Sequence, residues 1–353
     1  MPKKKLQDKP SHLAPHVKRP TIIDLERITG FSRGTISRAF KPEASIKPET
    51  REKILKVANE LGFALHPGAR MIRSQRTYRW GLLLPHLENP EYAELVECID
   101  AEARSRGTHL ILGLTHYDPK VESAFLRHWA AGEADGVISD VVSWNENQDL
   151  YRNLIARRFP FLVLYHAPEG LPVIRKNSLE SFCLGMRHLI GLGHVRIGYV
   201  GIEDSGAMYA NPIKAYKKEL KAEGLKLDES LMVFGGNNRE AGVAAWDYFK
   251  ALPDPPTAVL AFNDIIASGI WIGVHNDGLT IPKHLSLIGN DDIPEARLMG
   301  LSSISYDRKV LAREAISLLD QKRLNPELAP TVVDLKTDLI VRRSIDRPFK
   351  RKS

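Results

Sequence analysis

The first apolar residues with a regular spacing lie close to the N-terminus. Ile22, Leu25 and Ile28 recur every three residues, and Gly30 follows them as a natural helix stop. Two further groups of apolar residues at helical spacing come next, and the last of them ends at Gly62. Helices this short are not stable alone in water. The pattern therefore predicts three short helices that bury one small shared core.

The second of these predicted helices carries polar residues on one side. Ser32 is a suitable N-cap, and Ile36 and Ala39 mark the buried side. Two short helices joined by a tight glycine turn are typical of a helix-turn-helix, whose second helix enters the DNA major groove, where arginine pairs with guanine. An ordinary helical hairpin with a solvated polar face is the alternative. The polar side consists of Arg33, Gly34, Ser37 and Arg38.

Beyond residue 79 the pattern changes to short apolar runs that alternate with amphipathic stretches. Such alternation is typical of parallel sheets covered by helices on both faces, and a weak repeat indicates two similar α/β lobes. Ligands of such sheets bind beyond the carboxyl ends of the strands, so we expect a cleft between the lobes. Strands are predicted at residues 80–84, 110–114, 136–139, 161–164, 197–200, 258–262 and 285–289.

Charge distinguishes these two parts of the chain. Residues 1–79 contain 18 Lys and Arg against 7 Asp and Glu, a net charge of +11, whereas the whole chain carries +7. The remainder is therefore net negative, and the positive charge lies on the part with the predicted reading helix. A phosphate-binding surface requires this distribution, which favours DNA binding over the hairpin alternative.

The cysteine content suits a protein of a reducing compartment, and the apolar runs are too short for a membrane-spanning segment. Two cysteines, Cys98 and Cys183, are too few for a disulfide framework. No apolar run reaches the length of about 18 residues that a membrane span needs. The N-terminal MPKKKLQDKP lacks the apolar stretch of a secretory signal. An exported sugar-binding protein is a second alternative, but we expect it to have such a signal and to lack residues 1–79.

Motifs for catalysis are not found in the sequence. GLGH at residues 191–194 lacks a third glycine and precedes a predicted strand, so it is interpreted as a helix stop and not a dinucleotide motif. His86, His116 and His166 lie near strand ends without the spacing of a catalytic triad. No Walker, zinc-ligand or GxSxG pattern occurs. We therefore expect no enzyme activity, no metal and no cofactor.

Several longer segments match one protein family in order and spacing. They are TIIDLERITGFSRGTISRAF at 21–40, PETREKILKVANELGF at 48–63, GLGHVRIGYVG at 191–201, PTAVLAFNDIIASG at 256–269 and LSLIGNDDIPEA at 285–296. With these segments the chain resembles the lactose-repressor (LacI/GalR) family of bacterial transcription regulators from about Arg19 to Val341. The resemblance implies an all-α helix-turn-helix DNA-binding domain plus an α/β periplasmic-binding-protein-like body of two lobes.

The resemblance also implies partners and a mechanism. We expect a homodimer, cytoplasmic and associated with the nucleoid, that binds double-stranded operator DNA and acts as a repressor. A small-molecule effector, a sugar by resemblance, would bind between the lobes and change operator affinity. The sequence leaves open whether the effector induces or co-represses, whether the protein activates or represses, and whether dimers pair into tetramers.

Domain boundaries follow from the resemblance. Within the body, the first lobe is expected at about 80–165 plus 306–325 and the second at about 166–305 plus 326–345. The expected parts of the chain are a disordered basic arm at 1–18, the helix-turn-helix domain at 19–64, a hinge helix or linker at 65–79, the effector-binding and dimerisation domain at 80–345 and a basic tail at 346–353.

DNA contacts are expected from the reading helix and from the hinge. In the family, an apolar side chain of the hinge wedges into the minor groove, and here Ile72, flanked by Arg73 and with Ala69 one turn earlier, matches that position. Arg33, Gly34 and Arg38 are expected to face the bases. The residues expected to contact phosphates are Thr21, Ser32, Thr35 and Thr50.

Effector contacts are assigned by family correspondence. Asn263 and Asp291 fall among the residues that bind hydroxyl groups, although Asn263 also begins a predicted helix that Asp264 could cap. Core packing is the alternative role for the aromatic residues. The residues expected to face the effector are Tyr92, Asn177, Asn237, Asn263, Asp291 and Tyr306.

Two positions depart from the family pattern. The family has an arginine that grips the effector where this chain has Pro212, and an Asp-Asn pair where this chain has Lys176-Asn177. One cation is lost and another is gained nearby, so Arg175 or Lys176 is a candidate for the missing donor. We therefore expect an altered effector, or a regulator that works without one.

Overall fold

The structure is a computed structural model that describes residues 20–40, 44–63, 76–140, 144–167, 170–202 and 210–349. The chain falls into two compact units, Met1–Thr77 and Tyr78–Ser353. Each unit has its own hydrophobic core. Among the described residues, no helix combines the length and the apolar character that crossing a membrane demands.

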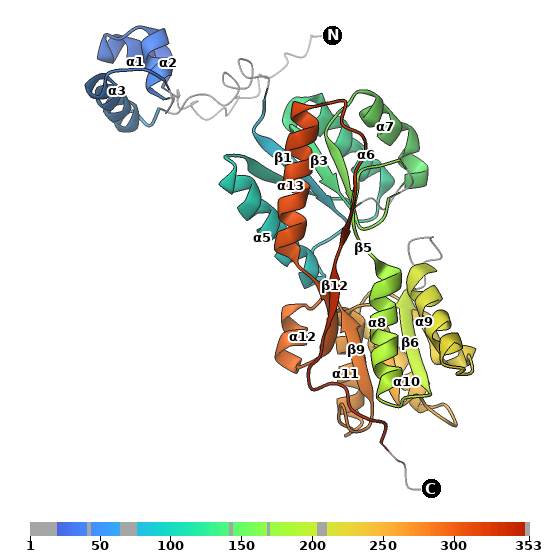
Figure 1. Cartoon of the computed structure of the whole chain (residues 1–353). Helices are drawn as coiled ribbons and strands as arrows, with labels where there is room; N and C mark the ends of the chain where they lie inside the picture. The colour runs from blue at the N-terminus through green and yellow to red at the C-terminus, as the bar shows by residue number, and fades with distance from the viewer. Residues whose placement is uncertain are drawn as a thin grey trace, which may run out of the picture. The chain divides into compact units, whose positions relative to one another are not determined.

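The described part of the N-terminal unit contains three helices, α1 (Ile22–Thr29), α2 (Arg33–Ala39) and α3 (Pro48–Glu60), shown in blue in Figure 1. A capping box between Thr21 and Asp24 starts α1, and Gly30 ends it in the left-handed conformation with φ 75°. The Ser32 hydroxyl accepts from the backbone N–H of Thr35 and starts α2. The small core consists of Leu25, Ile36, Ala39, Ile54, Ala58 and Phe63.

Two side chains of this unit lie on the opposite side from the one expected. Ile28 is 52% exposed, whereas its neighbour Thr29 is buried and donates to the carbonyl oxygen of Leu25. The residue four positions after Leu25 faces the core because α1 follows the 3.6-residue period. Ser37 is buried beside Ile36 and does not share the exposed face of α2.

The first lobe of the C-terminal unit is built on a parallel six-stranded sheet of order β11-β5-β4-β3-β1-β2. Its strands are β1 (Arg79–Leu84), β2 (His109–Leu114), β3 (Gly136–Ser139), β4 (Phe161–Leu164), β5 (Val173–Lys176) and β11 (Val332–Leu335). Its helices are α5 (Pro90–Ser105), α6 (Pro119–His128), α7 (Trp144–Ala156) and α13 (Arg308–Leu324), with a π-helical turn at Trp129–Glu133.

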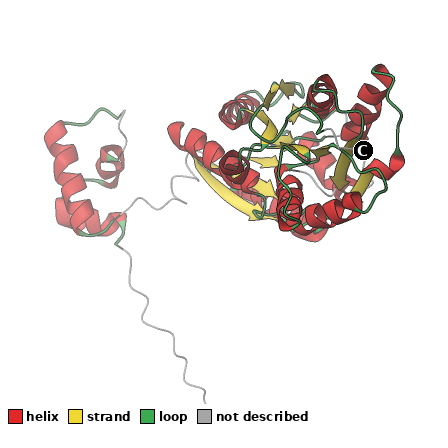
Figure 2. Ribbon diagram, turned by 90° about the horizontal axis from the view of Figure 1, so that it is seen from below, coloured by secondary structure: helices red, strands yellow, loops and turns green. Residues whose placement is uncertain are grey.

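The second lobe contains a six-stranded sheet of order β12-β10-β9-β8-β6-β7, in which β10 and β12 pair antiparallel. Its strands are β6 (Ile197–Ile202), β7 (Met232–Gly235), β8 (Ala258–Ala261), β9 (Ser286–Asn290), β10 (Ser302–Tyr306) and β12 (Thr337–Ile340). Its helices are α8 (Ser178–Gly191), α9 (Ala210–Ala222), α10 (Arg239–Lys250), α11 (Asp264–Asn276) and α12 (Pro294–Met299), with a 3-10 turn at Glu229–Leu231. Figure 2 shows helices on both sides of the strands of this unit.

The sheets divide the chain differently from the expected lobe boundaries. β5 belongs to the first sheet, so the first lobe continues to Lys176 and does not end near residue 165. β11 pairs with β5 in the same sheet, with Val332 opposite Val173, so the last crossing lies between Leu335 and Thr337 and not near residue 325. The middle crossing, between Tyr306 and Arg308, lies close to the expected place.

Candidate functional site

The exposed surface of α2 carries the side chains expected to read bases. Arg33, Gly34 and Arg38 are all exposed. Arg33 Nε donates to Glu26 Oε2 of α1 at 2.8 Å, and Arg38 Nε lies 3.4 Å from the carbonyl oxygen of Gly34. Both guanidinium groups are thus held by weak surface contacts that a stronger acceptor can replace.

The residues expected to contact phosphates are placed around α2 and at the start of α3. Thr21 and Ser32 are exposed N-caps, Thr35 lies in the first turn of α2, and Thr50 lies in the first turn of α3. Helix starts present free backbone N–H groups, which suit phosphate oxygens. The hinge residues Ala69, Ile72 and Arg73 lie outside the described residues.

A polar cavity of about 120 Å³ lies within the C-terminal unit, between residues of the two sheets. Tyr92, Asn237, Asn263 and Asp291 line it, as expected, and so does Pro212. The first lobe also contributes Asn89, Glu91, Tyr117, Asp140, Tyr165, His166 and Lys176, and the second lobe contributes Ser178, Phe182, Ile202, Phe262 and Asn290.

Two expected effector residues are absent from the lining of this cavity. The Asn177 side chain caps α8 by accepting from the backbone N–H of Glu180 at 3.3 Å. The Tyr306 hydroxyl donates to Glu91 Oε1 at 2.5 Å, and its ring packs in the core of the first lobe. The prediction for α11 also needs correction, because Asn263 is its N-cap and Asp264 is not.

Asn263 meets the other expected amide side chain in the cavity. Its Oδ1 accepts from the backbone N–H of Ile266, which fixes the rotamer, and its Nδ2 donates to Asn237 Oδ1 at 2.6 Å. Asn237 comes from the loop after β7, so two strand ends of the second sheet contribute adjacent amides. An amide pair of this kind offers donors and acceptors to hydroxyl groups of a ligand.

Asp291 follows β9 in an unusual backbone conformation. Its φ is 109° and that of Asp292 is 54°, both in the left-handed half of φ space that most side chains avoid. Its Oδ1 accepts from Lys176 Nζ at 2.8 Å and from Asn290 Nδ2 at 3.0 Å. Its Oδ2 lies 3.5 Å from Asn89 Nδ2. The strained turn therefore presents the carboxylate to donors of both lobes.

Among the described residues of the lining, Lys176 is the one lysine or arginine. It is the last residue of β5, and its ammonium lies 5.0 Å from the ring centre of Tyr165 and 4.9 Å from that of Tyr306. Burial alone would lower the pKa of this lysine, but the carboxylates of Asp291 and Glu91 outweigh burial and raise it. Glu91 is buried and accepts from the Tyr165 hydroxyl at 2.7 Å. Lys176 is therefore charged at neutral pH.

The alternation of side chains along β5 separates the two basic residues considered for the missing donor. Successive residues of a strand point to opposite faces. Lys176 points into the cavity, whereas Arg175 is half exposed and binds Asp334 of β11, with Nε 2.7 Å from Oδ1.

A third acidic group of the lining lies at the end of β3. Asp140 Oδ2 accepts from the Tyr92 hydroxyl at 2.6 Å, and burial raises the pKa of Asp140 to about 6. Burial, reinforced by the Asp140 charge, raises the pKa of Tyr92. Burial, followed by the charges of Lys176 and Arg175, lowers the pKa of His166 to about 4. His166 is therefore neutral at pH 7, and Lys176 carries the positive charge of the lining.

The segments 85–92 and 139–144 follow predicted strands and were expected to line the cleft, and they contain Asn89, Glu91 and Asp140 of the cavity lining, whereas Tyr165 was not expected there. The same signal exists for Tyr165, because it directly follows β4 of the first sheet, where ligand sites form. Glu91 and Asn89 lie in the loop and first turn after β1. Their roles depend on contacts across the sheet, which spacing along one strand does not reveal.

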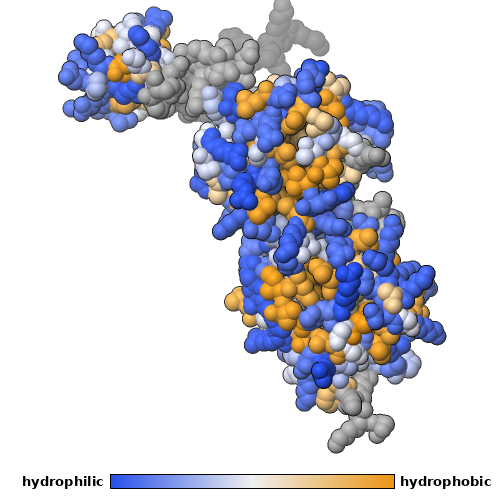
Figure 3. Space-filling view, in the orientation of Figure 1, coloured by the Kyte–Doolittle hydropathy of each residue, from blue (hydrophilic) through white to orange (hydrophobic). Residues whose placement is uncertain are grey.

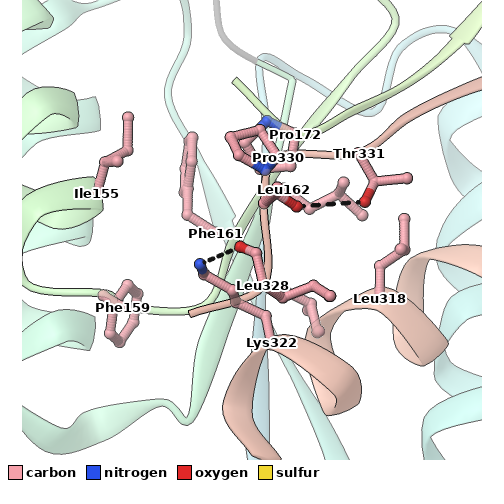
Figure 4. A pocket seen from close by; sticks show the side chains of 12 residues that line it. Ile155, Phe159, Phe161, Leu162, Pro172, Leu318, Lys322, Leu328, Pro330 and Thr331 are labelled. Carbon is pink, nitrogen blue, oxygen red and sulfur yellow. Dashed lines mark hydrogen bonds between the residues drawn. The ribbon is translucent and has the colours of Figure 1, made fainter. Parts of the chain in front are cut away.

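A separate apolar cavity of about 50 Å³ lies at the N-terminal ends of β4 and β5, at the opposite ends of the strands from the polar cavity (Figure 4). Phe161, Pro172 and Leu318 line it. Lys322 also lines it, and its ammonium donates to the carbonyl oxygens of Pro326 and Leu328. Its lining is mostly apolar, so it lacks the paired polar groups found in the first cavity.

The chain is similar to one family of domains and to two transcription regulators. Residues 186–345 match the family model of the periplasmic binding protein-like domain. The chain is 25% identical over 332 residues to the HTH-type transcriptional regulator DegA of Bacillus subtilis, covering 92% of this chain and 98% of DegA. It is 26% identical over 331 residues to the HTH-type transcriptional repressor PurR of Photobacterium profundum, with the same coverage.

The resemblance to the LacI/GalR family is confirmed. The fold agrees as well: the lac repressor dimer bound to operator and the anti-inducer ONPF superimposes with a TM-score of 0.80 at 20% identity, over 93% of this chain and 99% of that one. The LacI/GalR-like chain differs from the family pattern in the cavity itself, because both Pro212 and Lys176 belong to its lining.

Proposed function

We propose that this LacI/GalR-like chain is a sequence-specific DNA-binding regulator of transcription, and specifically a repressor whose operator affinity is controlled by a small molecule. One observation supports the proposal most: the similarity to DegA and PurR extends over 92% of the chain, so it includes the helical unit as well as the body. Catalysis, a metal and a cofactor have no part in the proposed function.

In this proposal α2 enters the major groove of the operator. Arg33 and Arg38 contact base edges, and Gly34 leaves its base pair without a side-chain contact. Thr21, Ser32, Thr35 and Thr50 position the unit on phosphates. Ala69, Ile72 and Arg73 are proposed as the minor-groove contact.

The proposed effector is a polyhydroxylated molecule of the carbohydrate class, bound in the cavity between the lobes. Tyr92, Asn237, Asn263 and Asp291 surround that space with donors and acceptors, and aromatic side chains form part of its wall. Hydroxyl-rich ligands need this combination of paired polar groups and apolar faces. We propose indirect roles for Asn177, which holds the start of α8, and for Tyr306, which orients Glu91.

Homodimerisation is proposed through the body. On the face seen in Figure 3, apolar side chains gather over parts of both lobes. Leu298 of α12 is 82% exposed, Leu324 of α13 is 73% exposed and Ile272 of α11 is 42% exposed. Two reading helices related by twofold symmetry would then contact a pseudo-palindromic operator, and the protein would act in the cytoplasm.

Selection of binding sites from a random duplex DNA pool with the full chain tests the proposal. We expect enrichment of a pseudo-palindrome with two half-sites. Arg38→Ala should weaken binding to the enriched site by about 1–3 kcal/mol and relax the preference at one base pair of each half-site. The matched control is Arg27→Ala, because Arg27 is an exposed arginine of α1 that is not expected to face DNA.

Two results would contradict the proposal. The first is the absence of any enriched sequence. The second is a uniform weakening by Arg38→Ala across all sequences, equal to that of Arg27→Ala, because loss of a phosphate contact alone behaves in this way.

A further inference from the structure

Lys176 is surrounded by the groups that recognise a bound ammonium ion. Its Nζ lies 2.8 Å from Asp291 Oδ1, 5.0 Å from the ring centre of Tyr165 and 4.9 Å from that of Tyr306. Aromatic faces and a carboxylate around a cation form the usual recognition site for ammonium ligands. We call Tyr165, Tyr306 and Asp291 the ammonium cage.

The cage is built into the core and not on the surface. Tyr165 is 8% exposed, Tyr306 is 5% exposed and Asp291 is 5% exposed. The two tyrosine hydroxyls lie 2.9 Å apart and both donate to Glu91, which fixes the orientation of their rings. An ordered cage of this kind is prepared for its cation before the cation arrives, which reduces the entropy lost on binding.

The contact inside the cage joins the two lobes. Lys176 ends β5 of the first sheet, whereas Asp291 follows β9 of the second sheet. Asn89 of the first lobe adds its amide to the same carboxylate. Separation of the lobes would break this ion pair, and removal of Lys176 from the closed cleft would leave a buried carboxylate without its cation, which is strongly unfavourable.

A second ion pair between the lobes provides a comparison. Glu94 of α5 pairs with Arg297 of α12, and both side chains are more exposed than Lys176 and Asp291. Solvent and salt weaken such an exposed pair, so its loss should affect lobe closure much less. Among the described residues, the Arg297 guanidinium does not lie over an aromatic ring. The Arg308 guanidinium, in contrast, lies over the ring of Tyr306.

We propose that Lys176 acts as a tethered ammonium ligand of the cleft, which holds the two lobes closed when no effector is bound. This inference rests on the proposed function only in treating the cleft as the effector site. It also predicts a new binding property, because a cage emptied of Lys176 should accept a free primary alkylammonium ion.

Chemical rescue of Lys176→Ala in the full chain tests the inference. The substitution removes the Cγ, Cδ, Cε and Nζ atoms, which n-propylammonium replaces atom for atom. We expect Lys176→Ala to unfold at a lower temperature and to show faster hydrogen exchange in segments 85–92 and 290–294 than the unmodified chain. Millimolar n-propylammonium chloride should raise its melting temperature by about 2–4 °C in a saturable way and slow that exchange.

Controls separate charge from packing. Neither sodium nor tetramethylammonium chloride should rescue Lys176→Ala, and n-propylammonium should not stabilise the unmodified chain, whose cage is filled. Lys176→Met keeps the packing and lacks the charge, so it should show the faster exchange without rescue. Arg297→Met should leave the exchange of segment 85–92 close to that of the unmodified chain and show no rescue.

Two outcomes would overturn the inference. One is a Lys176→Met variant whose exchange in both segments equals that of the unmodified chain, a measurement that holds even if Lys176→Ala does not fold. The other is a folded Lys176→Ala on which n-propylammonium and sodium act alike. None of these readouts involves DNA, so failure of operator selection and failure of the tethered ligand are distinguishable.

Discussion

Burial of Asp140 in the wall of the cleft disfavours the ionised form of its carboxyl group. The pKa of its carboxyl rises from the usual value of 3.8 to about 6, chiefly because the side chain is buried. The folded chain therefore holds this proton at pH values where the unfolded chain has lost it. The resulting contribution to stability is complete below about pH 4 and is lost as the pH rises through about 6.

Asp140→Asn should remove this dependence. Asparagine keeps an acceptor for the Tyr92 hydroxyl and stays neutral, so its stability relative to the unmodified chain should grow by about 2–3 kcal/mol between pH 4 and pH 7. Urea unfolding at several pH values measures the difference. Parallel pH profiles for the two proteins would show that Asp140 ionises normally in the fold.

Arg33 provides a prediction for the reading helix. Its pair with Glu26 is exposed, with side chains 62% and 36% accessible, so it contributes little to stability. Glu26→Gln should change the free energy of unfolding by less than about 0.5 kcal/mol, yet raise operator affinity several-fold because Arg33 is released toward the bases. Fluorescence anisotropy with the selected operator measures this.

Glu52→Gln is the matched control for that prediction, because Glu52 is an exposed glutamate on α3 of the same unit. Both substitutions remove one negative charge from the N-terminal unit. Equal gains in affinity from the two would mean that net charge is responsible, and that the Glu26 pair does not restrain Arg33.

At the scale of elements, α10 and α11 pack closely because both contain glycine at their crossing. A Cβ atom on Gly269 would lie 2.0 Å from the carbonyl oxygen of Arg239, and one on Gly242 would lie 2.1 Å from that of Ile266. Both obstacles are backbone atoms, so a side chain at either position must push the helices apart.

Gly269→Ala should therefore destabilise the body by about 2–3 kcal/mol, the usual cost of overpacking. Gly191→Ala is its control: this exposed glycine ends α8 and has no atom within 4 Å of an added Cβ, so the change should be neutral or slightly stabilising. Denaturant unfolding of both variants checks the pair. Similar stabilities for the two would contradict the close packing.

Most strands of the body were predictable because their apolar runs are continuous, and seven of them correspond to β1 to β4, β6, β8 and β9. Among the strands that were missed, β10, β11 and β12 have a different composition. β10 is SSISY, and its Ser302 and Ser303 are fully buried through hydrogen bonds to Ser344, Arg342 and Asp264, which no hydrophobic pattern indicates. β11 and β12 each place Asp within four residues and are recognisable only from their pairing.

The side chains of the cleft, like the strands, could be predicted from the sequence only in part. Asn263 and Asp291 follow strands in a family pattern and were predictable, and the structure places both in the cavity lining. Because Arg175 and Lys176 lie on opposite faces of β5, only one of them can face the cavity. The sequence did not predict β5, so it left both residues as candidates for the missing donor. The partnership of Glu91 with Tyr165 and Tyr306 joins residues 74 and 215 positions apart, and only the fold brings them together.

At the scale of the whole molecule, the two units differ in charge and in task. The basic unit would bind DNA, and the acidic body would set how well two such units fit an operator. Residues of both lobes meet at Asp291, so a ligand in the cleft competes for or reinforces contacts that hold the lobes together. A ligand controls operator affinity only to the extent that it binds one lobe arrangement more tightly than the other.

The most direct test of the account measures operator affinity with and without a cleft ligand. A thermal-shift screen of monosaccharides and disaccharides against the full chain supplies the ligand, and Asn263→Ala supplies a variant with an altered cleft. We predict that the ligand changes the Kd for the selected operator at least about fivefold, in line with usual allosteric coupling, and that Asn263→Ala loses both ligand binding and this change. A ligand that binds the unmodified chain in the cleft and leaves operator affinity unchanged would contradict the account.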